Sequence, residues 1–167
     1  MTKQLKNLIR QVPDFPKKGI NFLDITPLIS SGDALQVLIS QMGAMIEWSS
    51  VDVIIGIESR GFILGAALAA KHNKGFVPCR KAGKLPPPVH SESYSLEYGM
   101  ATLEMQPGQG RALIVDDVLA TGGTLKATIN IAEKSGFRVS DLLVLIDIPV
   151  LNSMKFKGEK IKSLFQY

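Results

Sequence analysis

The segment from Ala112 to Thr124, ALIVDDVLATGGT, constrains the fold of this chain more than any other. Its first four residues are apolar, as in a buried strand, and they lead directly into Asp116 and Asp117. Two glycines and two threonines follow, and then a stretch with helical spacing runs to Ser135, with Gly136 as its C′ residue. The pattern predicts a strand, a loop and a helix, with polar groups gathered where the strand gives way to the helix.

Further strands and helices alternate along the rest of the chain. Short apolar runs predict strands at Val53–Ile57, Gly75–Cys79 and Leu142–Ile148, and an edge strand at Ile161–Phe165. A small-residue stretch from Gly61 to Lys71 reads as a tightly packed helix. This alternation predicts an α/β fold with a mostly parallel, doubly wound sheet, whose ligands lie beyond the carboxyl ends of the strands.

Two helices are expected before the first of these strands. Apolar residues at helical spacing from Leu5 to Val12 predict a helix that closes before Pro13. A second apolar stripe from Leu35 to Ile46 predicts another helix, with Asp33 as its N-cap.

The segment 80–105 interrupts the alternation. Residues 80–92, RKAGKLPPPVHSE, combine basic residues, glycine and three prolines, which suits an exposed loop. Alternating residues from Tyr94 to Tyr98, a possible turn at Gly99-Met100 and a return to Met105 predict a hairpin that stands out from the main sheet.

Length and composition limit the possibilities further. With 167 residues and 46% hydrophobic residues, the chain is expected to form one domain, residues 1–167. Its net charge of 19 − 15 = +4 is mild and scattered, so it suggests at most an anionic small molecule and gives no case for nucleic acid. The lone Cys79 excludes an intramolecular disulfide. Because no apolar run suits a signal peptide or a membrane span, a cytoplasmic protein without membrane contact is expected.

The loop after Asp117 has the chemistry of an anion site. Main-chain N–H groups of Ala120, Thr121, Gly122, Gly123 and Thr124 would lie at a helix N-terminus, together with two threonine hydroxyls. Glycine lets the main chain approach the anion closely. Phosphate is the expected guest, but without a lysine in this loop or a G-x-G-x-x-G elsewhere, ATP and NAD sites are disfavoured.

Asp116 and Asp117 require a different partner, because carboxylates would repel a phosphate. Carboxylates accept hydrogen bonds from the vicinal hydroxyls of a sugar, so the pair predicts ribose. Successive side chains of a strand point to opposite faces, which leaves one aspartate for a nearby cation. Each feature alone is more often structural, but their combination at the end of an apolar strand favours a site.

The segment IVDDVLATGGT resembles the 5-phosphoribosyl 1-pyrophosphate (PRPP) motif of the type I phosphoribosyltransferases. Further matching segments extend this resemblance over nearly the whole chain and toward the members that act on adenine: PDFPKKGINFLDITPLI, IIGIESRGFILG, RKAGKLP, SYSLEYG and SLFQY. It implies a phosphoribosyltransferase-like fold with an N-terminal hood at residues 1–32 and a flexible loop and hairpin lid at 80–105. The implied reaction forms AMP and pyrophosphate from adenine and PRPP, in purine salvage.

The resemblance also implies roles for individual residues. The acidic pair would hold the ribose hydroxyls, the loop 120–124 the 5-phosphate, and a peptide strained before Ser59 part of the pyrophosphate. Arg60 would neutralise the leaving group in the fork geometry of a guanidinium. The complete pyrophosphate set is Glu58, Ser59, Arg60, Arg80, Lys81 and Lys84.

The resemblance also implies which residues bind the adenine base and which residue transfers its proton. Phe22 would lie against the purine, and main-chain groups of Asn21 and Leu23 would meet its edge. Glu97 would be the acid/base. Mg²⁺ is implied as a cofactor bound mainly through PRPP and water, without a direct protein ligand, and a homodimer is expected. The chain has Pro86–Pro88 where the family often has a glycine, which affects the geometry of the loop.

Two other functions stay open. The same core serves phosphoribosyltransferases for other bases, although the hood and SYSLEYG motifs argue against these. It also serves regulators that bind PRPP without turning it over, but the short segment before PDFP gives no DNA-binding module.

Overall fold

The computed structural model describes residues 2–96 and 99–167. The chain falls into two compact units, one ending at Gln41 and the other beginning at Met42. The expectation that residues 1–167 form a single domain stays a prediction.

The first unit contains a small antiparallel pair of strands. Its elements are α1 (Thr2–Lys6), β1 (Arg10–Pro13), β2 (Asn21–Asp24), α2 (Thr26–Ile29) and most of α3 (Gly32–Gly43). The prediction of one helix up to Val12 was wrong, because β1 pairs with β2 from Arg10↔Asp24 to Pro13↔Asn21. The buried carboxylate of Asp24 accepts from Arg10, Nη2–Oδ2 2.7 Å, and this ion pair favours the strand pairing.

The start of α3 also differs from the expected one. Asp33 lies within the helix, and the hydroxyl of Ser31 accepts from the amide of Ala34 at 3.3 Å instead. Serine is an equally good capping residue, and the helix begins at Gly32, two residues earlier than an N-cap at Asp33 implies.

The second unit carries the main sheet. Its elements are η1 (Trp48–Ser50), β3 (Val53–Ile57), α4 (Arg60–His72), β4 (Gly75–Lys81), β5 (His90–Leu96), β6 (Gly99–Met105), β7 (Gly110–Leu119), α5 (Gly123–Lys134), β8 (Phe137–Asp147), η2 (Pro149–Leu151), β9 (Lys155–Phe156), β10 (Glu159–Lys160) and β11 (Lys162–Gln166).

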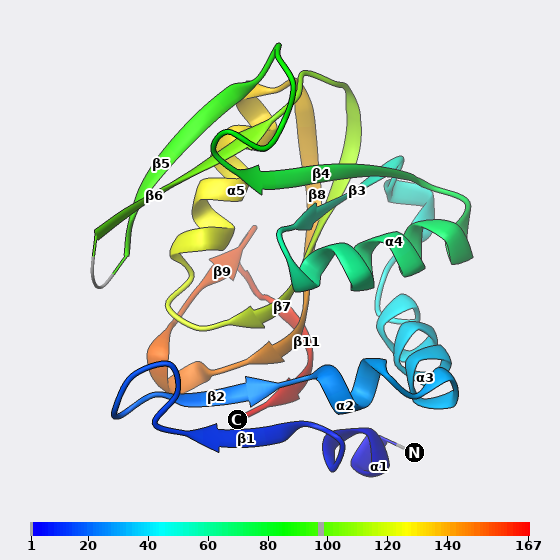
Figure 1. Ribbon diagram of the computed structural model, residues 1–167. Helices are drawn as coiled ribbons and strands as arrows, with labels where there is room; N and C mark the ends of the chain where they lie inside the picture. Colours follow the sequence, from blue (N-terminus) through cyan, green and yellow to red (C-terminus); the bar gives the residue numbers. More distant parts are fainter. Residues whose placement is uncertain (1, 97–98) are drawn as a thin grey trace. The chain divides into compact units, whose positions relative to one another are not determined.

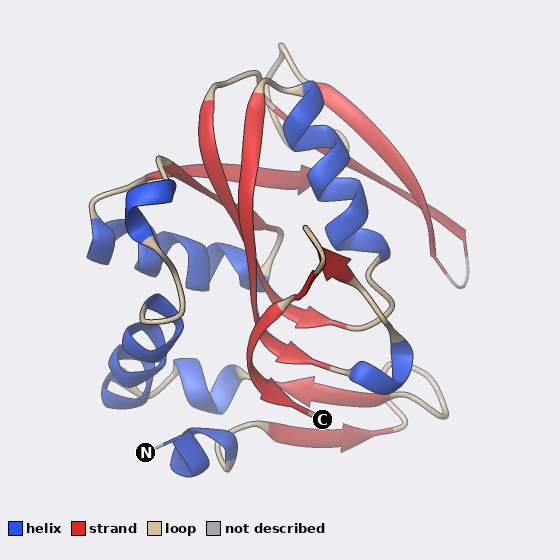
Figure 2. Cartoon of the chain, turned by 180° about the vertical axis from the view of Figure 1, so that it is seen from behind, coloured by secondary structure: helices blue, strands red, loops and turns tan. Residues whose placement is uncertain are grey.

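Seven strands form one sheet in the order β11-β8-β7-β3-β4-β6-β5 (Figure 1). The run from β11 to β4 is parallel, and β6 and β5 are antiparallel to their neighbours. Helices α4 and α5 lie on opposite sides of the parallel strands, as Figures 1 and 2 both show. This confirms the predicted mostly parallel α/β sheet. Among the described residues, no helix is long and apolar enough to cross a membrane.

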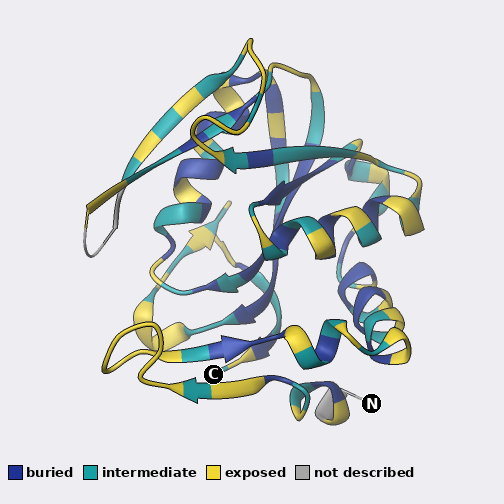
Figure 3. Ribbon diagram, viewed as in Figure 1, coloured by how far each residue is buried: buried dark blue, intermediate teal, exposed yellow. Residues whose placement is uncertain are grey.

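The core of this unit lies between the sheet and its helices, and the central strands are its most buried part (Figure 3). Ile55, Ile57 and Ile114 belong to one buried cluster with Leu125 and Ile131 of α5. Neighbouring residues of the same strands, such as Ile54 and Leu113, are fully buried as well. Strands that are apolar on both faces can be buried only between two layers, which explains why helices cover both sides of the sheet.

Strand β7 is longer than the apolar pattern suggested. It continues through the acidic pair, with Asp116 beside Val144 and Val118 beside Ile146 of β8. The two aspartates therefore lie within the strand, where they are 8% and 5% exposed, and not in the loop behind it.

The hairpin of β5 and β6 joins the main sheet, so the prediction that it stands apart was wrong. Strand β4 continues past Cys79, and Arg80 and Lys81 pair with Glu104 and Leu103 of β6. The hairpin pairs up to Leu96↔Gly99, so the expected turn residue Gly99 belongs to β6. The hairpin also contacts α5: Glu92 of β5 accepts from Asn130 at 3.0 Å and forms an ion pair with Lys134.

Candidate active site

A cavity of about 320 Å³ opens at the carboxyl ends of β3 and β7. Strand β3 and the turn after it contribute Ile57, Glu58, Ser59 and Arg60 to its lining, and β7 with its following loop contributes Asp116, Asp117, Val118, Ala120 and Thr124. Lys81, Tyr94 and Leu103 complete the wall. The structure thus brings together the two strand ends that the sequence singled out. This is the place where doubly wound sheets bind their ligands.

A larger depression of about 420 Å³ lies at the other end of the sheet, at the start of β7 and β8. It is lined by Asp52, Arg111, Glu133 and Arg138, among others. Arg111 is held there by Asp52, with Nη2–Oδ1 at 2.7 Å and Nε–Oδ2 at 2.9 Å. None of the predicted site residues lines it, whereas several of them line the smaller cavity.

The two aspartates of β7 differ in their surroundings. Burial and the neighbouring charge of Asp117 raise the pKa of Asp116 well above its usual range. Its Oδ1 accepts from the amide of Asp117 at 2.8 Å. Asp117 instead forms an ion pair with Nε of Arg60, the first residue of α4. The two successive carboxyl groups therefore have different partners.

A close approach of α4 to β7 makes the Arg60–Asp117 contact possible. A Cβ atom on Gly61 would lie 2.7 Å from the carbonyl oxygen of Val115 and 3.1 Å from Oδ1 of Asp116. Only glycine therefore fits at the second residue of this helix. The peptide between Glu58 and Ser59, at the start of the same turn, is cis.

The loop between β7 and α5 has the geometry of an anion site. Gly122 takes a left-handed conformation with φ +86° and precedes the first residue of α5. It has no side chain to cap the helix, and its carbonyl accepts from the amide of Lys126 at 3.0 Å in the first turn. The N–H groups of the first turn therefore have no partner within the helix. Ala120 and Thr124 line the cavity, whereas Thr121, Gly122 and Gly123 are not part of its lining.

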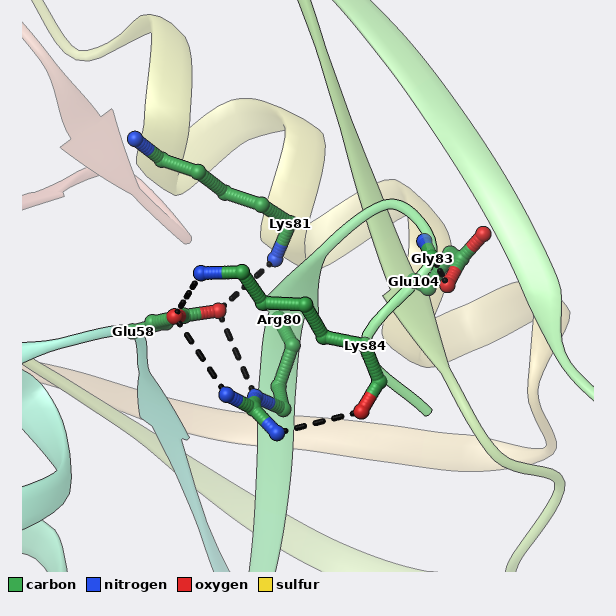
Figure 4. A network of polar contacts seen from close by, with 6 residues as sticks. All are labelled: Glu58, Arg80, Lys81, Gly83, Lys84 and Glu104. Carbon is green, nitrogen blue, oxygen red and sulfur yellow. Dashed lines mark hydrogen bonds and ion pairs between the residues drawn. The ribbon is translucent and has the colours of Figure 1, made fainter. Parts of the chain in front are cut away.

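The basic residues at the end of β4 surround one carboxylate, that of Glu58 (Figure 4). Oε1 of Glu58 accepts from Nζ of Lys84 at 2.6 Å, and Oε2 accepts from Nε of Arg80 at 3.3 Å and from the amide of Lys81 at 3.1 Å. Burial alone would raise the pKa of Glu58, but these hydrogen bonds outweigh it and lower the pKa to about 2. The side chain of Lys81 points away from Glu58 and lines the cavity.

The expected adenine-binding residues lie in the first unit. Asn21, Phe22 and Leu23 belong to strand β2. The side-chain Nδ2 of Asn21 donates to Oε1 of Gln11 at 2.9 Å, and the ring of Phe22 meets Phe15 edge-on at 5.3 Å. Leu23 is buried. Because Asn21 and Leu23 are two residues apart, their main-chain groups point to the same edge of β2.

Glu97, the expected acid/base, lies outside the described residues. Tyr94 was predicted only as part of the alternating pattern of the hairpin, and in the structure it also lines the cavity. Leu103 and Val118 were not predicted as lining residues either. Alternation separates the two faces of a strand, but it does not say which of them meets a ligand.

Comparison with known proteins places these features in a family. Residues 31–161 match the family model of the phosphoribosyl transferase domain. The adenine phosphoribosyltransferase of Bdellovibrio bacteriovorus is 52% identical over 163 residues, which cover 98% of this chain and 99% of the relative.

Solved structures agree with this match. The adenine phosphoribosyltransferase of Thermoanaerobacter pseudethanolicus has a TM-score of 0.90 at 39% identity and covers 100% of both chains. The enzyme from Saccharomyces cerevisiae, solved with an iminoalditol bisphosphate and adenine, has a TM-score of 0.86 at 33% identity and covers 97% of this chain and 96% of its own. The chain belongs to the type I phosphoribosyltransferases, and within them to the adenine phosphoribosyltransferase family.

Proposed function

We propose that this chain forms AMP and pyrophosphate from adenine and PRPP in the cavity at the carboxyl ends of β3 and β7. The observation that carries the proposal is the arrangement around the acidic pair. Asp116 and Asp117 lie between the N-terminus of α5 and the turn from Glu58 to Arg60, and all three line one cavity. A sugar that carries phosphate groups at two positions needs a carboxylate centre between two anion-binding ends.

The two ends would take different parts of PRPP. Residues 120–124 would bind the 5-phosphate, since the N–H groups of the first turn of α5 have no partner within the helix. The turn Glu58–Arg60, with Arg80, Lys81 and Lys84, would receive the pyrophosphate. Arg60 would stabilise the charge that develops on this leaving group, and its contact with Asp117 would align it with the sugar.

Asn21, Phe22 and Leu23 would bind adenine, and Glu97 would handle its proton. The ring of Phe22 is half-buried and would lie against the purine, while Asn21 and Leu23 would offer main-chain groups to its edge. Glu97 would take the proton that adenine loses as the new glycosidic bond forms, and would return it to the base in the reverse reaction.

Mg²⁺ would be bound mainly through PRPP and water. Among the described residues, no group of three or more metal-ligating side chains is found. Of the three carboxylates that line the cavity, Asp117 is paired with Arg60 and Glu58 with Arg80 and Lys84. Such a set fits an ion that keeps several waters and takes its other ligands from a substrate. When bound, Mg²⁺ would neutralise part of the charge of the pyrophosphate group.

The proposal extends to the state of the protein in the cell. We expect a homodimer, as the family resemblance implies. A lone, buried cysteine supports a reducing compartment such as the cytoplasm, because it offers no partner for an intramolecular disulfide.

The experiment that tests the function measures AMP formation from adenine and PRPP with Mg²⁺, for the wild type and for the double variant Asp116→Asn/Asp117→Asn. Neutral amides are weaker acceptors than carboxylates, so PRPP should bind about 10 to 100 times more weakly to the folded variant. Asp141→Asn is the control, because Asp141 pairs with Lys162 at the far edge strand β11. Unchanged PRPP affinity in the double variant, measured by calorimetry, would sink the assignment of the acidic pair.

A further inference from the structure

The proposed pyrophosphate site already contains an anion that belongs to the protein. The carboxylate of Glu58 is 11% exposed and lies among the donors of Arg80, Lys81 and Lys84. In Arg80, all three guanidinium nitrogens have partners: Nε and Nη2 contact Glu58 at 3.3 and 3.5 Å, and Nη1 donates to the carbonyl of Lys84 at 3.1 Å. Three of the five N–H groups of Arg80 and one of the three of Lys84 are thus engaged, so a second anion at this cluster would have to share its cations with Glu58.

We propose that Glu58 is an internal competitor of pyrophosphate, which occupies Arg80 and Lys84 and is displaced from them when the pyrophosphate group binds. The inference rests on the proposed function, because it takes these two residues as ligands of pyrophosphate. It changes the role of Glu58 from a binding residue to one that tunes how tightly the leaving group is held.

The charges of the cluster support competition. Arg80 and Lys84 together carry two positive charges, and the ionised carboxylate of Glu58 cancels one of them. A bound pyrophosphate would also meet Glu58 as a like charge at short range, which opposes binding. As pyrophosphate leaves, the carboxylate can take back its two cations, so the same group favours release of the product.

A purely positioning role makes the opposite prediction. If Glu58 only held Arg80 and Lys84 in a shape that fits pyrophosphate, removing its charge would loosen the two side chains and weaken binding. Competition instead predicts tighter binding after the same change. The sign of one affinity change therefore separates the two roles.

The test is the binding of inorganic pyrophosphate with Mg²⁺ to Glu58→Gln, measured by calorimetry. Glutamine keeps the size of the side chain, removes its charge and turns an amide N–H₂ toward the donors of Arg80. We expect the dissociation constant to fall about tenfold, which is the effect of about 1.4 kcal/mol of relieved repulsion. Binding that is unchanged or weaker overturns the proposal.

A matched control lies directly opposite Arg80. Glu104 pairs with Arg80 across β4 and β6, but its carboxylate accepts from the amide of Gly83 at 2.9 Å (Figure 4). Glu104→Gln changes the same charge near the same turn and should leave the affinity for pyrophosphate within about twofold of the wild type. An equal gain in both variants would assign the effect to overall charge and would also refute competition.

Two further measurements keep the test decisive. In a double-mutant cycle, Glu58→Gln should have a smaller effect when Lys84 is already Met, because one of the contested cations is gone. If Glu58→Gln does not fold, the Nε–H resonance of Arg80 in the wild type, identified by its loss in Arg80→Lys, should shift on addition of pyrophosphate. A resonance that stays in place contradicts displacement. AMP formation by the wild type is measured separately, so a failure of the proposed function is distinguishable from a failure of this inference.

Discussion

The hydroxyl of Thr124, at the start of α5, lies 3.4 Å from the phenol oxygen of Tyr94 in β5. This contact joins the hairpin to the loop that we propose to hold the 5-phosphate of PRPP, and both residues line the cavity. The hairpin and the phosphate loop, which are 30 residues apart in sequence at these positions, therefore meet at the site itself.

Tyr94→Phe should weaken the binding of PRPP and leave the binding of adenine unchanged. The variant keeps the ring but removes the partner of Thr124, and one such hydrogen bond contributes roughly 0.5–1.5 kcal/mol, or about two- to tenfold in KM for PRPP. Steady-state kinetics with each substrate varied in turn would measure this. An equal rise in KM for adenine would show that Tyr94 acts on the whole site and not on the phosphate end.

Glu97→Gln should lower the rate of chemistry while PRPP still binds. General acid or base catalysis typically contributes roughly 10² to 10⁴ in rate, and we expect a loss of this size in kcat. The control is Glu92→Gln in the same hairpin, because Glu92 is engaged by Asn130 and Lys134 of α5. Single-turnover chemistry at the wild-type rate in Glu97→Gln would mean that the proton is handled elsewhere.

Adenine should be preferred over hypoxanthine by a factor on the order of 10⁴ in kcat/KM. Adenine offers a donor at N6 and an acceptor at N1, and hypoxanthine reverses both. Main-chain groups of Asn21 and Leu23 that match adenine would face like partners in hypoxanthine, and mispaired buried groups discriminate strongly. Product formation with a panel of bases tests this, and comparable efficiencies on the two bases would refute the assignment of these main-chain groups.

The stability of the second unit should fall as the pH drops below about 6.5 because of His72. Its ring stacks on Trp48 at 3.7 Å, and burial, with the charges of Lys71 and Lys74, lowers its pKa below the ordinary value of 6.5. The unfolded chain then binds the proton more readily than the folded one, so stability is full above pH 6.5 and is lost as the pH falls toward the folded pKa.

Thermal melting between pH 7 and pH 5 would measure this loss. His72→Phe is the comparison, because phenylalanine can stack on Trp48 but does not titrate. The melting temperature of the wild type should fall further than that of the variant over this range. Equal falls in the two proteins would mean that other groups cause the pH dependence.

Much of the sheet could be predicted because its signals are local. The strand Val53–Ile57 has the predicted bounds, and α4 and α5 begin and end within a few residues of their expected limits. Gly136 has φ +97°, as expected of a residue that ends a helix. Each of these depends on apolar spacing or on a single special residue.

The errors concern pairings between distant parts of the chain. The apolar residues up to Val12 fit a helix, and only the partner strand Asn21–Asp24 decides that residues 10–13 are extended. The hairpin joins the sheet because β4 continues through Arg80 and Lys81, whose charges had indicated a loop. The hydrophobic periodicity of one segment does not show which other segment it will pair with.

The candidate site shows the same division. The order of the elements along the chain was enough to place the ends of β3 and β7, the acidic pair, Ala120 and Thr124 in one cavity. The ion pairs of Glu58 with Arg80 and Lys84 could not be predicted from the sequence, because they depend on how far side chains extend between the ends of two neighbouring strands.

The short pairing of β4 with β6 has a mechanical consequence. Arg80 and Lys81 hold the hairpin in the sheet with their main chains, and the same residues are proposed to meet the leaving group with their side chains. A shift of the peptide units at this junction would move the hairpin and the basic side chains together. One movement at this junction would then both release pyrophosphate and withdraw the hairpin from the reacting sugar.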